Sequence, residues 1–255
     1  MSAPATRDAA VCRLAGAESL LVCLDFDGTI SEIVTDASAA RAHPDALRAI
    51  RNLSALPRTE VAVLSGRHLD GLRGVFPLGD PVVLVGSHGA EPSQGGPELS
   101  RADTDYLDRI QAELEAFARP PAFVEVKPYQ RVLHVAALAE VDPAAARVML
   151  DRALALDTGG RPVTEGRNVV EFSAVDVTKG TWLAGHKTAF AATLFAGDDT
   201  TDETAIAVLG PEDVGIKVGE KPSAAALRLP SVNEMARFLR DLARARAAGP
   251  RSGRE

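Results

Sequence analysis

The chain has 255 residues, a length that suits one large domain or two modest ones. Hydrophobic residues make up 46% of it and charged residues 25%, which excludes a disordered, collagen-like or coiled-coil protein. The formal net charge of −7 excludes a generally basic surface, so we expect no nucleic-acid partner.

The first residues of the chain are too polar for a secretory signal peptide. Arg7, Asp8 and Arg13 stand where such a peptide carries an apolar run. The two cysteines, Cys12 and Cys23, are too few for a disulfide framework, and no apolar run reaches the length of about 18 residues that a membrane span needs. We therefore expect a cytoplasmic protein with no membrane partner.

Five short apolar runs rich in Val, Leu and Ile predict strands. They cover residues 20–26, 60–64, 82–85, 192–196 and 214–218. Helical patterns occur at residues 44–56, 181–190 and 232–247. Strands that are apolar throughout and alternate with helices are typical of a parallel sheet covered on both faces. The sequence therefore predicts an α/β fold with a doubly wound, Rossmann-like parallel sheet as its core.

A different pattern over residues 101–173 predicts a small α+β module inserted into this core. A helix is expected at residues 102–118, strands at 123–127 and 131–137, a second helix at 143–156, and strands at 161–165 and 168–171. The order is α-β-β-α-β-β. We expect residues 1–100 and 174–255 to form the core domain and residues 101–173 to form the inserted one.

Polar residues follow four of the predicted core strands directly. In open α/β sheets ligands bind outside the carboxyl ends of the strands, near the switch point, so these residues are expected to share one crevice. They are Asp25, Asp27, Ser65, His88, Asp198 and Asp202.

The acidic residues of this set predict a metal ion. Two carboxylates at about 4 Å repel by roughly 4 kcal/mol at an effective dielectric near 20, so a cation is needed among them. Oxygen ligands without a Cys or Cys/His pattern favour Mg²⁺ over zinc. Thr200 and Glu203 also fit a helix capping box, an alternative for residues 198–203 that leaves Asp25 and Asp27 unexplained.

Lys179 and Ser65 indicate that the same site binds a phosphate group. Lys179 opens a predicted helix, where a cation opposes the helix dipole, so it is better suited to clamping a phosphate or screening a nucleophilic carboxylate. Ser65 can donate its hydroxyl to the same phosphate. The set predicts phosphoryl transfer in which Asp25 attacks phosphorus and Asp27 protonates the leaving alcohol and then activates water.

At these residues the sequence resembles the haloacid dehalogenase superfamily of aspartate-nucleophile phosphatases. Four motifs match in order: Asp25-x-Asp27-Gly-Thr, Ser65-Gly-Arg67, Lys179-Gly, and Gly-Asp198-Asp with a following Asp202. The resemblance implies that Mg²⁺ is held by Asp25, by the backbone carbonyl of Asp27 and by Asp198. Asp202 is implied to act through water or an outer contact.

Within that superfamily the chain is most similar to the trehalose-6-phosphate phosphatase family. Further matching segments are residues 86–91, 125–127 and 166–171. The resemblance implies hydrolysis of trehalose 6-phosphate to trehalose and phosphate, with a mobile cap at residues 101–173. It implies that four cap residues contact the sugar, namely Glu125, Lys127, Arg167 and Glu171. It also implies two further substrate ligands in the core, Arg67 and His88.

Two departures from the family pattern concern the substrate. Val135 and Ala136 stand where the family usually has Tyr and Arg, and Ser173 and Ala174 replace a basic residue and a proline. A phosphatase for a related sugar or pseudo-disaccharide (aminocyclitol) phosphate is therefore the alternative. A signalling receiver module and a phosphomutase are the other classes with similar residues, and the sequence indicates no oligomeric state.

Overall fold

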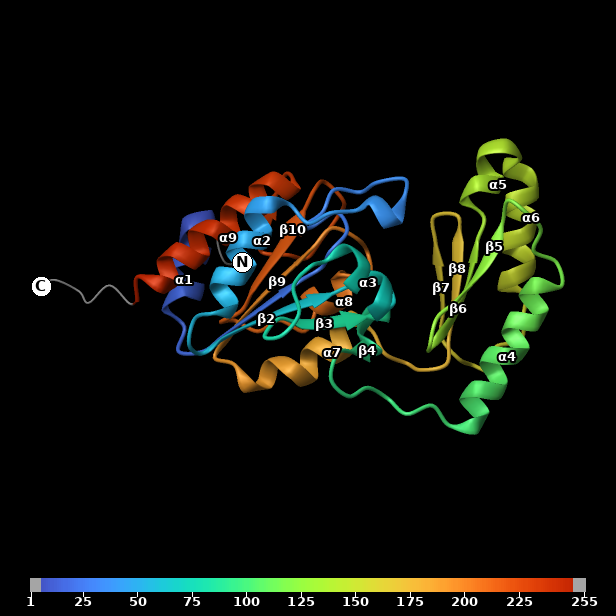
Figure 1. Cartoon of the computed structure of the whole chain (residues 1–255), viewed down its shortest axis with the longest axis horizontal. Helices are drawn as coiled ribbons and strands as arrows, with labels where there is room; N and C mark the ends of the chain where they lie inside the picture. The colour runs from blue at the N-terminus through green and yellow to red at the C-terminus, as the bar shows by residue number, and fades with distance from the viewer. Residues whose placement is uncertain (1–5, 250–255) are drawn as a thin grey trace, which may run out of the picture. The chain divides into compact units, whose positions relative to one another are not determined.

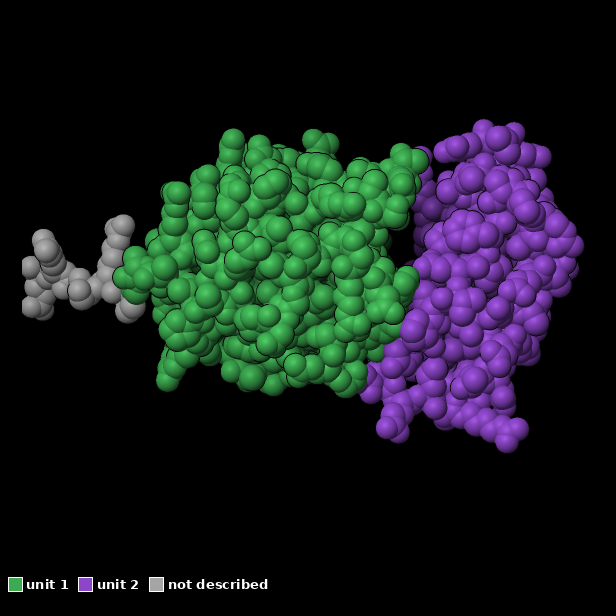
Figure 2. Space-filling view, in the orientation of Figure 1, with its two compact units in different colours: residues 1–95, 177–255 green, residues 96–176 purple. Residues whose placement is uncertain are grey.

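The structure is a computed structural model, and it describes residues 6–249. These residues divide into two compact units, coloured separately in Figure 2. Unit 1 contains the residues up to Gly95 and those from Val177 onward, and unit 2 contains Gly96–Asp176. Among residues 6–249, no helix has the length and apolar character that crossing a membrane requires.

Unit 1 is built on a seven-stranded sheet in the order β11-β10-β9-β1-β2-β3-β4 (Figure 1). Neighbouring strands are parallel except β3 and β4. The strands are β1 (Leu20–Leu24), β2 (Thr59–Leu64), β3 (Val83–Gly86), β4 (Glu91–Pro92), β9 (Ala192–Gly197), β10 (Val214–Val218) and β11 (Leu227–Leu229). The chain leaves β1 in one direction and returns as β9 on its other side, so the switch point lies between these two strands.

Both faces of this sheet are covered, because successive residues of each strand point to opposite sides. Leu20, Val22 and Leu24 of β1 enter one core, whereas Leu21 and Cys23 enter the other. The first core includes residues of α1 (Arg7–Gly16), α2 (Pro44–Ser54), α3 (Leu69–Val75) and α9 (Val232–Ala247). The second includes residues of α7 (Lys179–His186) and α8 (Glu203–Ile206).

The predicted doubly wound parallel sheet is confirmed, with all five predicted strands and the helices α2, α7 and α9. The elements that were not predicted include α1, α3, β4 and β11. The edge strands β4 and β11 have two and three residues, too few for a periodic pattern. β4 also carries Pro92, which an antiparallel edge position tolerates.

Unit 2 contains an antiparallel sheet in the order β5-β6-β8-β7. Its elements are α4 (Arg101–Glu115), β5 (Phe123–Val126), β6 (Gln130–His134), α5 (Ala136–Val141), α6 (Pro143–Leu154), β7 (Val163–Gly166) and β8 (Val169–Ser173). One face packs on the helices through a core that includes Ile110, Leu114, Leu133, Leu150, Val170 and Phe172.

The predicted helix and strand order of this unit is confirmed with one addition. The strand predicted over residues 131–137 ends at His134, and α5 starts at Ala136. The strand prediction for residues 136–137 was wrong because the segment Ala-Ala-Leu-Ala-Glu-Val is rich in strong helix formers.

Candidate active site

β1 delivers Asp25 to the carboxyl edge of the core sheet. The strand is buried along its whole length, and the backbone N–H of Asp25 still bonds to the carbonyl of Ala196 at the end of β9 (2.9 Å). The chain then turns at Gly28, whose φ of +78° lies in the left-handed region that favours glycine. The turn brings the hydroxyl of Thr29 to Oδ2 of Asp25 (3.3 Å).

Lys179 joins two of the acidic residues. Thr178 caps α7 in a capping box with Thr181, and this fixes Lys179 as the first residue of the helix. Its Nζ donates to Oδ1 of Asp25 (2.6 Å) and to Oδ1 of Asp202 (2.7 Å). Burial lowers the pKa of Lys179, but the two carboxylates outweigh that effect and raise it overall, so the ammonium stays charged.

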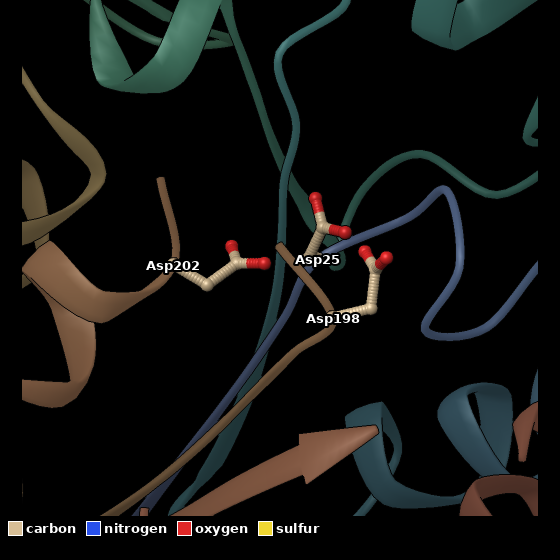
Figure 3. A group of neighbouring side chains, drawn as sticks. All are labelled: Asp25, Asp198 and Asp202. Carbon is tan, nitrogen blue, oxygen red and sulfur yellow. The ribbon is translucent and has the colours of Figure 1, made fainter. Parts of the chain in front are cut away.

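Asp25, Asp198 and Asp202 form one acidic cluster, and each has a carboxylate oxygen within 4.8 Å of the others. Figure 3 shows the carboxylates of Asp25 and Asp198 close together and that of Asp202 reaching toward them from the other side. Asp202 is fully buried and accepts the N–H of Asp199 (2.8 Å). The helix-cap alternative for residues 198–203 is wrong, because α8 has no side-chain cap hydrogen bond.

The electrostatics of the cluster fit a divalent cation. Burial raises the pKa of Asp25 to about 8 and that of Asp198 to about 6, and neighbouring carboxylates add to both shifts. Three carboxylates against one ammonium leave two negative charges in excess when all are ionised. Hard oxygen ligands with this charge suit a cation such as Mg²⁺ or Ca²⁺, which would also keep Asp25 ionised at neutral pH.

Replacing Gly28 with Ala should weaken metal binding. A Cβ at this position would overlap the carboxylate of Asp198, and the left-handed backbone adds about 1–2 kcal/mol of strain for a non-glycine residue. The measurement is a Mg²⁺ titration that records the rise in melting temperature. If displacing the carboxylate of Asp198 costs about 1.4 kcal/mol of binding free energy, the variant should need roughly tenfold more Mg²⁺.

The matched control for this change is Gly74→Ala in α3, where a Cβ would meet no atom within 4 Å. It should leave the metal titration unchanged. An unaltered Mg²⁺ requirement in Gly28→Ala would show that Asp198 is not a metal ligand.

Arg67 makes a two-pronged bond to Asp27. Its Nε and Nη2 donate to the two carboxylate oxygens, both at 2.7 Å, and its Nη1 donates to the carbonyl of Ala37 (2.7 Å). The backbone N–H of Arg67 donates to Oγ of Ser65 (3.1 Å), a buried residue at the end of β2. The structure thus brings Ser65, Arg67 and Asp27 into one hydrogen-bonded group, in which Arg67 orients Asp27.

His88 lies in a strained turn beside this group. Ser87 and His88 both have positive φ, +47° and +55°. Glu91 supports the turn by accepting from the hydroxyl of Ser87 (2.8 Å) and the N–H of Leu69 (2.8 Å). The ring of His88 lies so close to Gly66 that a Cβ there would overlap it. His88 is thereby held next to the loop that carries Ser65.

The four candidate sugar ligands lie in unit 2, and the structure brings three of them together. Lys127 pairs with Glu171 (Nζ to Oε2, 3.0 Å), and Glu125 bonds to His134 (Oε2 to Nε2, 2.8 Å). Glu125 and Glu171 both lie opposite Val132 in the strand register, on the same face of the sheet. Arg167 is exposed in the turn between β7 and β8.

Sequence reasoning missed two lysines at the core site. Lys217 is buried in β10 and donates to the carbonyl of Asp199 (2.8 Å) and to Glu203 (3.0 Å). Lys221 contacts Asp199 (2.8 Å) and approaches Asp198 (3.8 Å). A lysine inside the apolar run Val-Gly-Ile-Lys-Val was a usable signal, because lysines are almost never buried without a partner.

Comparison with known sequences identifies the family of this chain. The trehalose-phosphatase family model matches residues 23–233. The chain is 35% identical to the trehalose-phosphate phosphatase of Mycobacterium tuberculosis, covering 88% of this chain and 61% of that protein. It is 34% identical to the bifunctional trehalose-6-phosphate synthase/phosphatase of Thermoproteus tenax, covering 84% of this chain and 30% of that one. The chain thus spans less than two thirds of these relatives.

Solved structures share the fold. The C-terminal domain of the C. albicans trehalose-6-phosphate phosphatase superposes with a TM-score of 0.75 at 19% identity, covering 95% of this chain and 98% of that one. The Aspergillus fumigatus trehalose-6-phosphate phosphatase gives 0.69 at 21% identity, covering 96% and 100%.

Proposed function

The chain belongs to the trehalose-phosphatase family, and we propose that it hydrolyses trehalose 6-phosphate to trehalose and phosphate through an aspartyl-phosphate intermediate. The observation that carries this proposal is the position of Asp25. Its carboxylate lies at the end of β1, bonded to Lys179 and within 4.8 Å of Asp198 and Asp202. The family assignment supports trehalose 6-phosphate as the substrate.

Asp25 is the nucleophile. One of its oxygens forms a bond to phosphorus as the bond between phosphorus and the sugar oxygen breaks. Lys179 offsets the negative charge around Asp25 and favours its ionised form. Ser65 accepts from Arg67, and its own hydroxyl proton can donate to a phosphate oxygen.

The acidic cluster would hold Mg²⁺ through the carboxylates of Asp25 and Asp198 and the backbone carbonyl of Asp27. Asp202 would contribute through water, as the family resemblance implies, while it holds Lys179 and accepts the N–H of Asp199. When bound, Mg²⁺ supplies positive charge beside the phosphoryl group. The oxygen-only ligand set and its excess negative charge support this assignment.

Asp27 is the general acid and base. It gives a proton to the sugar oxygen in the first step. In the second step it takes a proton from water, which attacks phosphorus and breaks the bond between phosphorus and the oxygen of Asp25. Arg67 donates to both oxygens of Asp27 and therefore fixes the position of this carboxylate. We propose this positioning as the role of Arg67, alongside any contact that it makes to the substrate.

Unit 2 is proposed to be the cap that recognises the sugar, through Glu125, Lys127 and Glu171 on one face of its sheet. Charged side chains of this kind each offer several hydrogen bonds to hydroxyl groups. Arg167, at the hairpin turn, is a separate candidate contact, and His88 is a candidate contact from the core.

A related sugar or aminocyclitol phosphate is the second candidate substrate. Val135 is fully buried in the core of unit 2, and Ala136 starts α5. Neither position offers the hydroxyl or guanidinium that the family usually places there. This loss of polar groups favours a substrate with a different hydrogen-bonding pattern from trehalose.

A substrate panel with Mg²⁺ tests the proposal. The panel contains trehalose 6-phosphate, glucose 6-phosphate, an aminocyclitol pseudo-disaccharide phosphate and p-nitrophenyl phosphate. We expect the highest kcat/KM for trehalose 6-phosphate, no phosphate release in EDTA, and recovery when Mg²⁺ is restored.

A much higher kcat/KM for another member of the panel would overturn the substrate, and activity that survives thorough chelation would overturn the metal. Release of free phosphate separates a phosphatase from a mutase. The family assignment argues against a signalling receiver. The cytoplasmic location stays a prediction.

A further inference from the structure

The face of the unit 2 sheet that points away from its helices carries an aromatic pair. Phe123 on β5 and His134 on β6 are directly opposed in the strand register. Their rings stack with centroids 4.7 Å apart and planes 13° from parallel. His134 is fixed in turn by Glu125, which bonds to its Nε2 at 2.8 Å.

Phe123 is unusual because its side chain is exposed although it is held in place. The residue is 56% exposed, whereas the other phenylalanines of this unit, Phe117 and Phe172, are buried. A ring held by stacking loses little conformational freedom when a ligand covers it, so its apolar surface contributes more fully to binding.

The polar surroundings of this pair specify the kind of ligand. Glu125 lies two residues along the same strand, so its side chain is on the same face as Phe123. Glu171, which lies level with Glu125 across β6, forms an ion pair with Lys127. A flat apolar ring beside charged hydrogen-bonding groups matches a pyranose, which has an apolar face of C–H groups and a rim of hydroxyls.

We propose that Phe123, stacked on His134, is a platform for one pyranose ring of the substrate and contributes to sugar specificity. This inference rests on the proposed function and deepens it. It assigns apolar recognition to a unit in which Val135 and Ala136 lack the polar groups that the family usually places there. The platform acts on binding and takes no part in breaking the phosphate ester.

Steady-state kinetics of Phe123→Ala and Phe123→Tyr test the platform. We expect Phe123→Ala to raise KM for trehalose 6-phosphate about tenfold and to change kcat less than about threefold, since the contact is present in both ground and transition states. Phe123→Tyr keeps the ring and should stay close to wild type. Hydrolysis of p-nitrophenyl phosphate, which has no sugar, should be unchanged in both variants.

The matched control is Val126→Ala. Val126 is on the same strand and 54% exposed, but by strand alternation it lies on the opposite face. It should leave KM for trehalose 6-phosphate unchanged. If Phe123→Ala has the same KM as Val126→Ala, or if p-nitrophenyl phosphate is affected equally, the platform is overturned while the proposed function stands.

A binding measurement separates this inference from the proposed function. Saturation-transfer NMR on the full chain follows magnetisation passed from aromatic protons to the C–H protons of unphosphorylated trehalose and of a second disaccharide, maltose. Transfer that Phe123→Ala removes and Val126→Ala keeps supports the platform, even if the panel shows no trehalose 6-phosphate hydrolysis. Absence of Phe123-dependent transfer to both sugars overturns it.

Discussion

Replacing Asp25 with Asn should abolish phosphate release from trehalose 6-phosphate, with a loss of at least ~10³-fold. The amide has nearly the same size and can still accept the hydrogen bond from Lys179, but it has no ionised oxygen to attack phosphorus. The measurement is phosphate release at saturating Mg²⁺. Circular dichroism of the variant should match wild type, because β1 and its neighbours are untouched.

The same variant should be more stable than wild type when no metal is bound. Burial raises the pKa of Asp25 to about 8, far above the value of about 4 expected in the unfolded chain. The folded state therefore holds this proton more tightly, and the free energy of unfolding falls as pH rises between these two values. In EDTA, the stability advantage of Asp25→Asn over wild type should grow by roughly 1–3 kcal/mol between pH 5 and pH 8. The measurement is the difference between the two melting temperatures at each pH.

Asp199→Asn is the matched control, since Asp199 is the neighbouring carboxylate that pairs with Lys221 on the half-exposed rim of the site. It should keep activity within about threefold of wild type. An active Asp25→Asn protein would show that the nucleophile is misassigned. A pH-independent difference in melting temperature between Asp25→Asn and wild type would show that Asp25 is not held in its protonated form.

The core fold and its acidic cluster were predictable because both leave strong local signals. A run such as Leu-Leu-Val-Cys-Leu before Asp25 indicates a strand buried on both faces, and the switch-point rule then places Asp25 and Asp198 at one edge. The elements that were missed leave weaker signals. α3 has seven residues and includes Gly71 and Gly74, both poor helix formers, so tertiary packing of Leu72 and Val75 decides its conformation.

Side-chain pairings were the least predictable part of the site. Nothing in the sequence distinguishes an Arg67 that binds substrate from an Arg67 that holds Asp27, because the contact joins residues 40 positions apart. The stacking of Phe123 on His134 depends in the same way on the register of β5 and β6, which the turn between them sets. Residue types and the strand ends that they follow predicted the acidic cluster, whereas the packing of separate segments determines which partner each residue has.

The second large effect is expected for Asp27→Asn, and it should depend on the leaving group. Trehalose 6-phosphate has a poor leaving alcohol that needs a proton, so loss of the acid should slow its turnover by roughly 10²–10⁴-fold. p-Nitrophenolate departs without a proton, so formation of the aspartyl phosphate from p-nitrophenyl phosphate should be nearly unchanged. The breakdown of the aspartyl phosphate still needs Asp27 as a base and should be slow.

Rapid-mixing kinetics therefore should show a burst of about one p-nitrophenolate per enzyme, followed by slow turnover, and the phosphorylated protein should accumulate enough for mass spectrometry to detect it. Trehalose 6-phosphate should give no burst, because the first step is then itself slow. The exposed carboxylate variant Asp36→Asn, next to the Ala37 carbonyl that Arg67 contacts, should behave as wild type with both substrates. Equal losses of activity on the two substrates, without a burst, would mean that Asp27 only orders the loop. The loss of a purely structural residue would not depend on whether the leaving group needs a proton.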